Sequence, residues 1–182
     1  MIRKGHWVYW IAQSGNPAYA AVVDFLFYKH IISMEDFAGA YLARKNDIFA
    51  LPRDQNHTIA IFHLGGLAVE CCLKSLLLGY HKINKFDKNS NRPKDSMYNQ
   101  PVINPSHGLF MALKRMSDFH KKAKSDFQLL KHLQTIMYPL GSTDVDYISL
   151  RYIPQTTKSQ EDWQKSFDYV CGWLEKNEKT IL

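Results

Sequence analysis

The chain has 182 residues, of which 46% are hydrophobic and 22% are charged. These values are typical of one globular domain with a substantial core, and they exclude a disordered chain. The formal net charge of +6 favours an anionic partner such as RNA or a nucleotide, although charge alone does not identify one.

The cysteines and the amino terminus indicate a cytoplasmic protein. Cys71, Cys72 and Cys171 are odd in number and form no C-x-x-C pair, which excludes a disulfide framework and a zinc ribbon. The opening MIRKGHWVYWIA has only a short apolar run and lacks a small-residue cleavage site, so we expect no signal peptide.

The first third of the chain predicts an irregular start followed by two helices. Residues 1–16 read as irregular or as a short strand, and Pro17 suits the first turn of a helix. Ser33 is the predicted N-cap of the next helix, which runs to about Leu51 and is stopped by Pro52.

Residues 58–80, TIAIFHLGGLAVECCLKSLLLGY, predict a helix that is apolar on nearly every side. One narrow stripe is polar; its members are His63, Gly66, Glu70 and Lys74, with His81 on the same line. The helix is long enough to cross a bilayer, but two central charges would each cost about 3 kcal/mol there. We therefore expect a buried core helix and no membrane.

The polar stripe has three interpretations. It is a solvated strip, in which Glu70 and Lys74 form an i, i+4 pair. Alternatively, Lys74 binds a phosphate and Glu70 orients either Lys74 or Arg151. In the third interpretation Glu70 and Arg151 form an internal pair, since buried carboxylates need a partner. The adjacent Gly65 and Gly66 indicate close helix packing rather than a phosphate cradle.

The second half of the chain predicts three further helices. Residues 82–105 form a long polar loop, and Ser106 is the predicted N-cap of one helix that continues through residue 124. A helix over 127–138 ends at Pro139, and residues 141–158 read as an extended connector in which Pro154 keeps its predecessor out of helical geometry. The last helix begins at Ser159.

These elements predict an all-α fold, an antiparallel up-and-down helical bundle of five to six helices with a long polar loop near 82–105. We expect a single domain over 1–182, with an N-terminal helical extension at 1–55 and a bundle core at 56–178.

Three segments resemble signatures of the HEPN family of helical-bundle domains. The stretch AVECCLKSLL at 68–77 is similar to the pattern A-x-E-x-x-L-K-x-L-L. Ser106-His107-Gly108-Leu109 resembles the H-x-L that opens a later helix, and Leu150-Arg151-Tyr152-Ile153-Pro154 resembles the A-R-Y-P element before the last helix. The three segments occur in the family's order.

The resemblance implies a HEPN-like module that binds a nucleotide or RNA, without strong catalytic activity of its own. It implies a homodimer, and it allows the alternative of an interaction partner for a nucleotidyltransferase. The expected ligand-binding residues are Glu70, Lys74, His107, Arg151 and Tyr152.

A second alternative is a metal-independent endoribonuclease toxin, because many HEPN members use Arg followed by His after four to six residues. Arg115 and His120 have this spacing. On one continuous helix the two side chains would be about 140° apart, so they would converge only at a kink or across two subunits. No metal-ligand spacing, P-loop or G-x-G-x-x-G occurs, so we expect neither a metal nor a cofactor.

Basic residues cluster in two places that could contact RNA. One group belongs to the helix after His107, and the other to the long loop, where Phe86 and Tyr98 could stack on bases. Such faces are also common as simple solvated surfaces. The groups are Lys114, Arg115, Lys121, Lys122 and Lys124, and Lys82, Lys85, Lys88, Arg92 and Lys94.

Overall fold

The computed structural model describes residues 35–86, 94, 99 and 101–179. The chain divides into two compact units, Met1–Glu35 and Asp36–Leu182, and all described residues except Glu35 belong to the second. The elements predicted for residues 1–34 lie outside the described residues. The second unit begins well before the predicted core at 56–178, because the helix preceding residue 55 packs against the central helix of the core.

The described residues form six α-helices, two short 3-10 helices and no strand, which confirms the all-α prediction. Residues 82–105 contain no helix where they are described, as the polar composition predicts; Lys94 and Pro101 form an isolated antiparallel bridge. The elements are α3 (Phe37–Ala50), η1 (Gln55–His57), α4 (Thr58–His81), α5 (Leu109–Lys114), α6 (Ser117–Ser125), α7 (Phe127–Met137), η2 (Ser149–Tyr152) and α8 (Gln160–Glu178).

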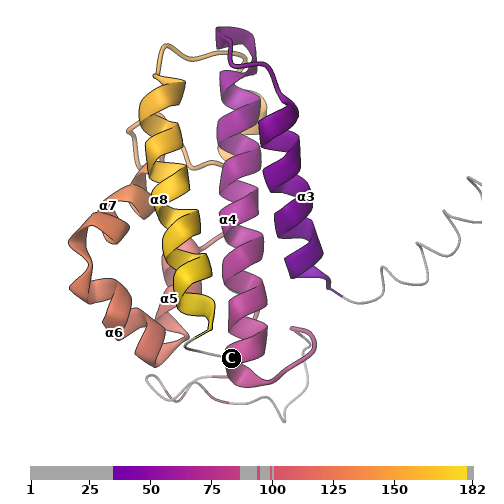
Figure 1. The fold of residues 1–182 in the computed structure, drawn as a ribbon, viewed down its shortest axis with the longest axis vertical. Coiled ribbons are helices and arrows are strands. Elements are labelled where there is room, and N and C mark those ends of the chain that lie inside the picture. Colours follow the sequence, from indigo (N-terminus) through magenta and orange to yellow (C-terminus); the bar gives the residue numbers. More distant parts are fainter. Residues whose placement is uncertain (1–34, 87–93, 95–98, 100, 180–182) are drawn as a thin grey trace, which may run out of the picture. The chain divides into compact units, whose positions relative to one another are not determined.

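Helix α4 lies at the centre of the unit. Helix α3 runs antiparallel to it, and α8 runs in the same direction as α4 (Figure 1). Helices α6 and α7 lie on the far side of α8, whereas α5 contacts α4. Residues of α4 contact α3, α5, α7, α8 and η2. Any side chain on α4 is therefore placed by the elements that surround it.

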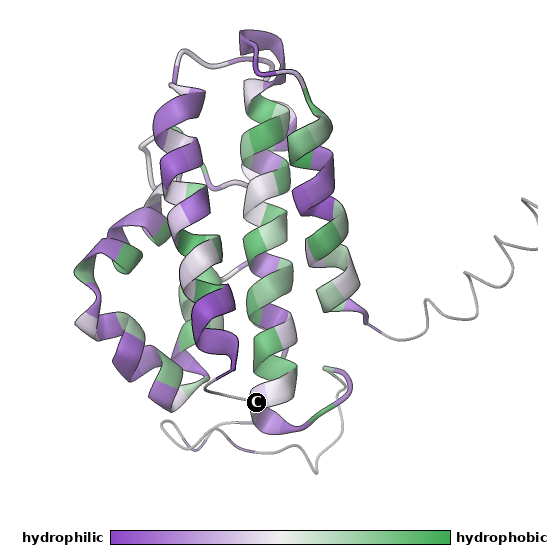
Figure 2. Cartoon of the chain, viewed as in Figure 1, coloured by the Kyte–Doolittle hydropathy of each residue, from purple (hydrophilic) through white to green (hydrophobic). Residues whose placement is uncertain are grey.

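Helix α4 is buried on most sides, as its apolar sequence predicts, and hydrophobic residues extend along almost its whole length (Figure 2). By length and composition alone it could span a membrane, and 67% of its most apolar window is buried inside the protein. The core helix of a folded domain has the same properties, so this is weak evidence for a membrane. Its polar residues Glu70 and Lys74 are buried as well, at 7% and 6% exposed.

The two glycines in α4 let neighbouring rings approach its backbone, which confirms the interpretation of Gly65 and Gly66 as packing residues. A β-carbon at Gly65 would overlap the Trp163 ring, and one at Gly66 would overlap the Tyr147 ring. Trp163 also stacks on Phe167, with ring centroids 5.2 Å apart. Gly66 thereby places Tyr147 directly against the polar stripe.

Helix α3 begins later than predicted. Ser33 lies outside the described residues, and the observed N-cap is Asp36, whose carboxylate accepts a hydrogen bond from the Gly39 backbone N–H at 2.8 Å. Aspartate is as good an N-cap as serine, so the helix begins at the later cap without loss of capping. The helix ends at Ala50, shortly before Pro52, as predicted.

The prediction of one helix after Ser106 is wrong. Ser106 has a positive φ of 53° and forms a turn, Gly108 is the N-cap of α5, and the chain breaks at Arg115 and Met116 before α6 begins. The break is stabilised because the Arg115 carbonyl accepts a hydrogen bond from the His81 ring at 2.8 Å. It also lets Phe119 pack against Trp173, with ring centroids 4.9 Å apart.

The connector before α8 is partly helical, which corrects the prediction of an extended segment. Ser149–Tyr152 form η2, and Asp146 just before it accepts hydrogen bonds from the Ser149 backbone N–H and hydroxyl, at 2.8 and 2.7 Å. Ile153 is extended before Pro154, as predicted, with φ −104° and ψ 119°. The Ser159 hydroxyl accepts from the Asp162 N–H, which confirms the predicted start of α8.

Candidate functional site

Glu70 is the centre of a buried polar cluster on α4. Its Oε1 accepts a hydrogen bond from the Lys74 ammonium at 2.6 Å. Its Oε2 accepts from the Tyr147 hydroxyl at 2.5 Å and is 2.9 Å from His107 Nδ1. One carboxylate thus joins the central helix, the turn before α5 and the connector before α8.

These donors keep the Glu70 carboxyl ionised. Burial acts to raise its pKa, but hydrogen bonds from His107, Lys74 and Tyr147, together with the Lys74 charge, outweigh burial and hold the pKa below its ordinary value. The pKa of the Tyr147 phenol is raised far above its ordinary value by burial and by its hydrogen bond to Glu70. The phenol therefore stays protonated and donates.

The ionised Glu70 fixes the orientation and the tautomer of His107. An ionised carboxylate only accepts hydrogen bonds, so Nδ1 of His107 carries the proton. The His107 side chain is 53% exposed, whereas Glu70 beneath it is 8% exposed. Because Nδ1 faces the buried carboxylate and half of the side chain is exposed, we infer that the other ring nitrogen, Nε2, faces solvent. The ring also packs edge-on against Tyr147, at an interplanar angle of 84°.

Lys74 is an internal partner of Glu70. Its ammonium group is bonded to the carboxylate and lies 5.3 Å from the centre of the Phe37 ring, which gives it a cation–π contact with α3. A phosphate outside the bundle cannot reach an ammonium in this position. The geometry therefore gives Lys74 the role of holding Glu70 rather than that of contacting a ligand.

The polar stripe on α4 binds the segments that cross it. His63 Nδ1 is 2.7 Å from the Tyr147 carbonyl, Gly66 accommodates the Tyr147 ring, and His81 bonds the Arg115 carbonyl. The two histidines each satisfy a backbone carbonyl in a segment that crosses the stripe. The interpretation of the stripe as a solvated strip is therefore wrong.

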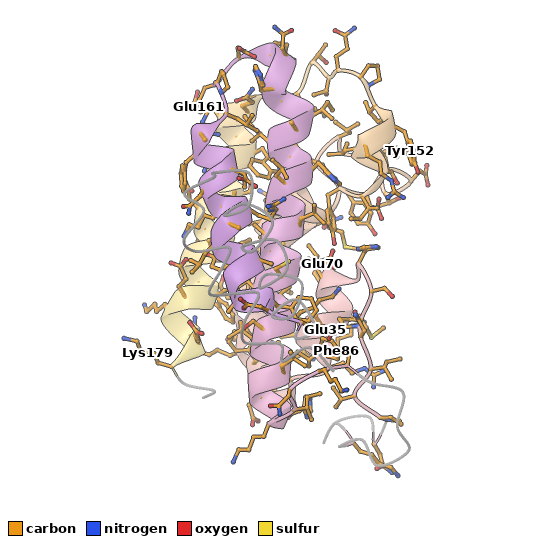
Figure 3. All side chains as sticks on the ribbon, turned by 90° about the vertical axis from the view of Figure 1, so that its right-hand side faces the viewer. Glu35, Glu70, Phe86, Tyr152, Glu161 and Lys179 are labelled. Carbon is orange, nitrogen blue, oxygen red and sulfur yellow. The ribbon has the colours of Figure 1, made fainter. Side chains whose placement is uncertain are left out.

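Arg151 and Tyr152 lie in η2, close in sequence to Tyr147, and both are exposed, Tyr152 at 75%. The Arg151 guanidinium carbon is 4.9 Å from the centre of the Tyr152 ring. Figure 3 shows Tyr152 projecting outward. The predicted internal pair of Glu70 with Arg151 is wrong, because Tyr147 and His107 occupy the Glu70 Oε2 atom.

The predicted catalytic pair is divided by the break between α5 and α6. Arg115 is half-buried at the break, whereas His120 is 6% exposed on α6. Among the described residues the His120 Nδ1 has no hydrogen-bond partner. Burial and the nearby Lys124 and Lys114 charges lower the His120 pKa, which keeps its ring neutral. The chain does bend between Arg115 and His120, as their convergence would require, but the His120 side chain is buried.

The basic residues of α5 and α6 form an exposed surface. Their exposed members are Lys114, Lys121, Lys122 and Lys124. In the loop, Phe86 packs against Phe37, with centroids 5.8 Å apart, which leaves its ring partly buried rather than open for a base. The predicted loop residues Lys88, Arg92 and Tyr98 lie outside the described residues.

The thiols and metal-ligating groups offer no second site in the described part of the chain. Burial raises the pKa of the Cys171 thiol to about 12 and that of Cys72 further still. These thiols are therefore protonated and unreactive at neutral pH. No group of three or more His, Cys, Asp or Glu side chains among the described residues is placed to hold a metal ion.

Tyr147 is the member of the cluster that sequence reasoning missed. It lies in a connector without periodicity, so no local pattern marks it as buried. The indirect signal was Gly66, because a glycine within a core helix indicates the close approach of another group. The partner in that approach is 81 residues away and cannot be read from the helix alone.

Comparison with protein-family models, with curated proteins and with solved structures finds no match to this chain.

Proposed function

We propose that the chain is a HEPN-like bundle that binds the phosphate of a nucleotide or RNA at the surface around His107, without strong catalytic activity of its own. The observation that carries the proposal is the pair of His107 and Glu70. A buried carboxylate holds one ring nitrogen, and the other faces solvent. An imidazole held in this way accepts a hydrogen bond from a ribose hydroxyl or, when protonated, donates one to a phosphate oxygen.

Two exposed residues of η2, the 3-10 helix that follows Tyr147, suit the same ligand. Arg151 presents an exposed guanidinium, whose fork matches phosphate oxygens. Tyr152 offers an exposed ring, and stacking of a base on an aromatic side chain is worth about 1–3 kcal/mol. Both follow Tyr147, which donates to the same Glu70 oxygen that faces His107.

The arrangement of the three motif segments supports the HEPN-like interpretation. Glu70 comes from the first segment and His107 from the second, and a hydrogen bond joins them. The third segment begins in η2, which packs against α4. Segments that resemble one family in sequence order therefore all lie against, or bond to, the same central helix.

The test is titration of the full chain with adenosine triphosphate and with a short single-stranded RNA, by calorimetry and fluorescence anisotropy. We expect His107→Gln and Arg151→Ala each to weaken binding at least about tenfold, which corresponds to about 1.4 kcal/mol. The matched controls are His57→Gln, a partly exposed histidine 2.7 Å from the Asp54 carboxylate, and Arg44→Ala, which pairs with Asp47. No binding, or equal losses in the controls, contradicts the proposal.

The same RNA also tests the alternative that the chain is an endoribonuclease. Incubated with the chain in EDTA, the RNA is expected to stay intact. Cleavage that disappears in both Arg115→Ala and His120→Ala would instead assign the activity to that pair.

A further inference from the structure

A pocket of about 510 Å³ lies between α3 and α8, at the end of the bundle where α3 finishes and α8 begins (Figure 1). None of its lining residues belongs to the Glu70 cluster. Its volume lies within the range of small-molecule sites, which is about 300–1,000 Å³. The lining residues are Phe49, Arg53, Gln160, Glu161, Gln164, Lys165 and Asp168.

The apolar part of this pocket is the ring of Phe49 in the last turn of α3. The Phe49 side chain is 57% exposed, so much of its ring is open to solvent. A ligand with an aromatic or aliphatic group that covers this ring removes apolar surface from water. An aromatic group also gains from ring packing.

The four charges that line the pocket form one closed pair and two open groups. Lys165 pairs with Glu161, at 3.3 Å. Arg53 and Asp168 form no ion pair among the described residues, and Gln164 lies between them. Its side-chain oxygen accepts from Arg53 Nη1 at 3.0 Å, and its amide nitrogen donates to Asp168 Oδ1 at 2.8 Å. A cation and an anion are thus held on either side of one amide group.

Both open groups have capacity for a ligand. Arg53 and Asp168 are exposed, and the guanidinium has further N–H donors besides Nη1. Within the described part of the chain, Asp168 Oδ2 accepts no hydrogen bond, which leaves it open to a donor. A nucleotide or RNA does not suit this pocket, because the Asp168 carboxylate repels phosphate. The complementary ligand carries an anion and a cation close together, beside an apolar group.

We propose that this pocket binds a free α-amino acid with an aromatic or other large apolar side chain. The ligand's carboxylate accepts hydrogen bonds from the Arg53 guanidinium, and its ammonium group donates to Asp168. One carbon atom joins these two groups, so they are spaced much like the oxygen and nitrogen of the Gln164 amide beside them. The ligand's side chain packs on Phe49. The site is independent of phosphate binding at His107.

The first test titrates the full chain with L-phenylalanine and with three analogues, followed by the shifts of backbone resonances in ¹H–¹⁵N spectra. N-acetyl-L-phenylalanine lacks the ammonium group, L-phenylalanine amide lacks the carboxylate, and L-alanine lacks the ring. We expect saturable binding of L-phenylalanine, and at least about fivefold weaker binding of each analogue, about 1 kcal/mol. No saturation with L-phenylalanine at millimolar concentrations overturns the proposal. Equal affinity for the N-acetyl or amide form also overturns it.

The second test assigns the two charges by combining variants with analogues, and circular dichroism checks that each variant is folded. Arg53→Ala is expected to weaken L-phenylalanine binding at least about fivefold. It should bind the amide at least as well as the wild type does, because the amide has no carboxylate for Arg53. Asp168→Asn is expected to behave in the same way toward the N-acetyl form.

The matched controls are Arg44→Ala and Asp118→Asn, which remove charges outside the pocket. Both are expected to leave all four affinities unchanged. If Arg53→Ala or Asp168→Asn weakens every ligand by the same factor, or if the controls weaken L-phenylalanine equally, the assigned contacts are wrong.

Discussion

The substitution Gly66→Ala tests how the fold delivers Tyr147 to Glu70. Alanine favours a helix over glycine by at most about 1 kcal/mol, so propensity alone predicts a more stable protein. In this structure the added methyl group would overlap the Tyr147 ring. Overpacking of that kind costs about 1–3 kcal/mol, and loss of the hydroxyl bond to an ionised carboxylate costs about 1.5–3 kcal/mol more. We expect the free energy of unfolding to fall by roughly 1.5–5 kcal/mol.

Urea unfolding followed by circular dichroism measures this loss, and the chain contains its own control. Gly172 lies in α8, where a β-carbon would meet nothing within 4 Å. Gly172→Ala is therefore expected to stabilise the protein by up to about 1 kcal/mol. If Gly66→Ala is as stable as the wild type, or if both substitutions change stability in the same direction, the inference that the Tyr147 ring lies against Gly66 is wrong.

Three further predictions concern charge and exposure. Glu70→Gln is expected to destabilise the protein by about 3–5 kcal/mol at pH 7, because Lys74 is left buried without its counter-ion. The folded-state pKa of Glu70 is depressed, so its stabilisation is present above its ordinary value of 4.5 and is lost as pH falls through the lower folded value. Unfolding of Glu70→Gln should thus depend less on pH in that window, and an unchanged dependence would argue against the ionised cluster. Arg151→Ala should change stability by less than about 0.5 kcal/mol, since Arg151 is exposed; a larger loss in thermal melts would reinstate a structural role. Iodoacetamide should label Cys71, which is partly exposed, before Cys72 and Cys171, as mass spectrometry of peptides can show; the reverse order would contradict their burial.

The sequence predicted those parts of the fold that depend on local pattern. The apolar run of α4, the cap at Ser159 and the extended Ile153 before Pro154 each follow from residues within one or two turns, and all three are confirmed. The glycine pair in α4 also indicated close packing correctly, because few other reasons place two glycines within a core helix.

The parts that failed depend on partners distant in sequence. The break at Arg115 is stabilised by the His81 ring, and no pattern within residues 106–124 reports a hydrogen bond from another helix. The same holds for the cluster. Glu70 and His107 were both candidates, but Tyr147, which completes the carboxylate's shell, belongs to a connector without periodicity. The sequence pattern favours Arg151 as a partner for Glu70, whereas the carboxylate is satisfied by Lys74 on its own helix and by the Tyr147 hydroxyl and the His107 ring.

The protonation site of the His107 ring tests most directly the claim that Glu70 orients His107 for phosphate binding. In long-range ¹H–¹⁵N spectra of the imidazoles, we expect the neutral ring to carry its proton on Nδ1 in the wild type and to lose that preference in Glu70→Gln. Addition of adenosine triphosphate should then shift the Nε2 resonance of His107 and leave that of His57 unchanged. A neutral ring protonated on Nε2, or an Nε2 resonance that does not respond to the nucleotide, would contradict the account.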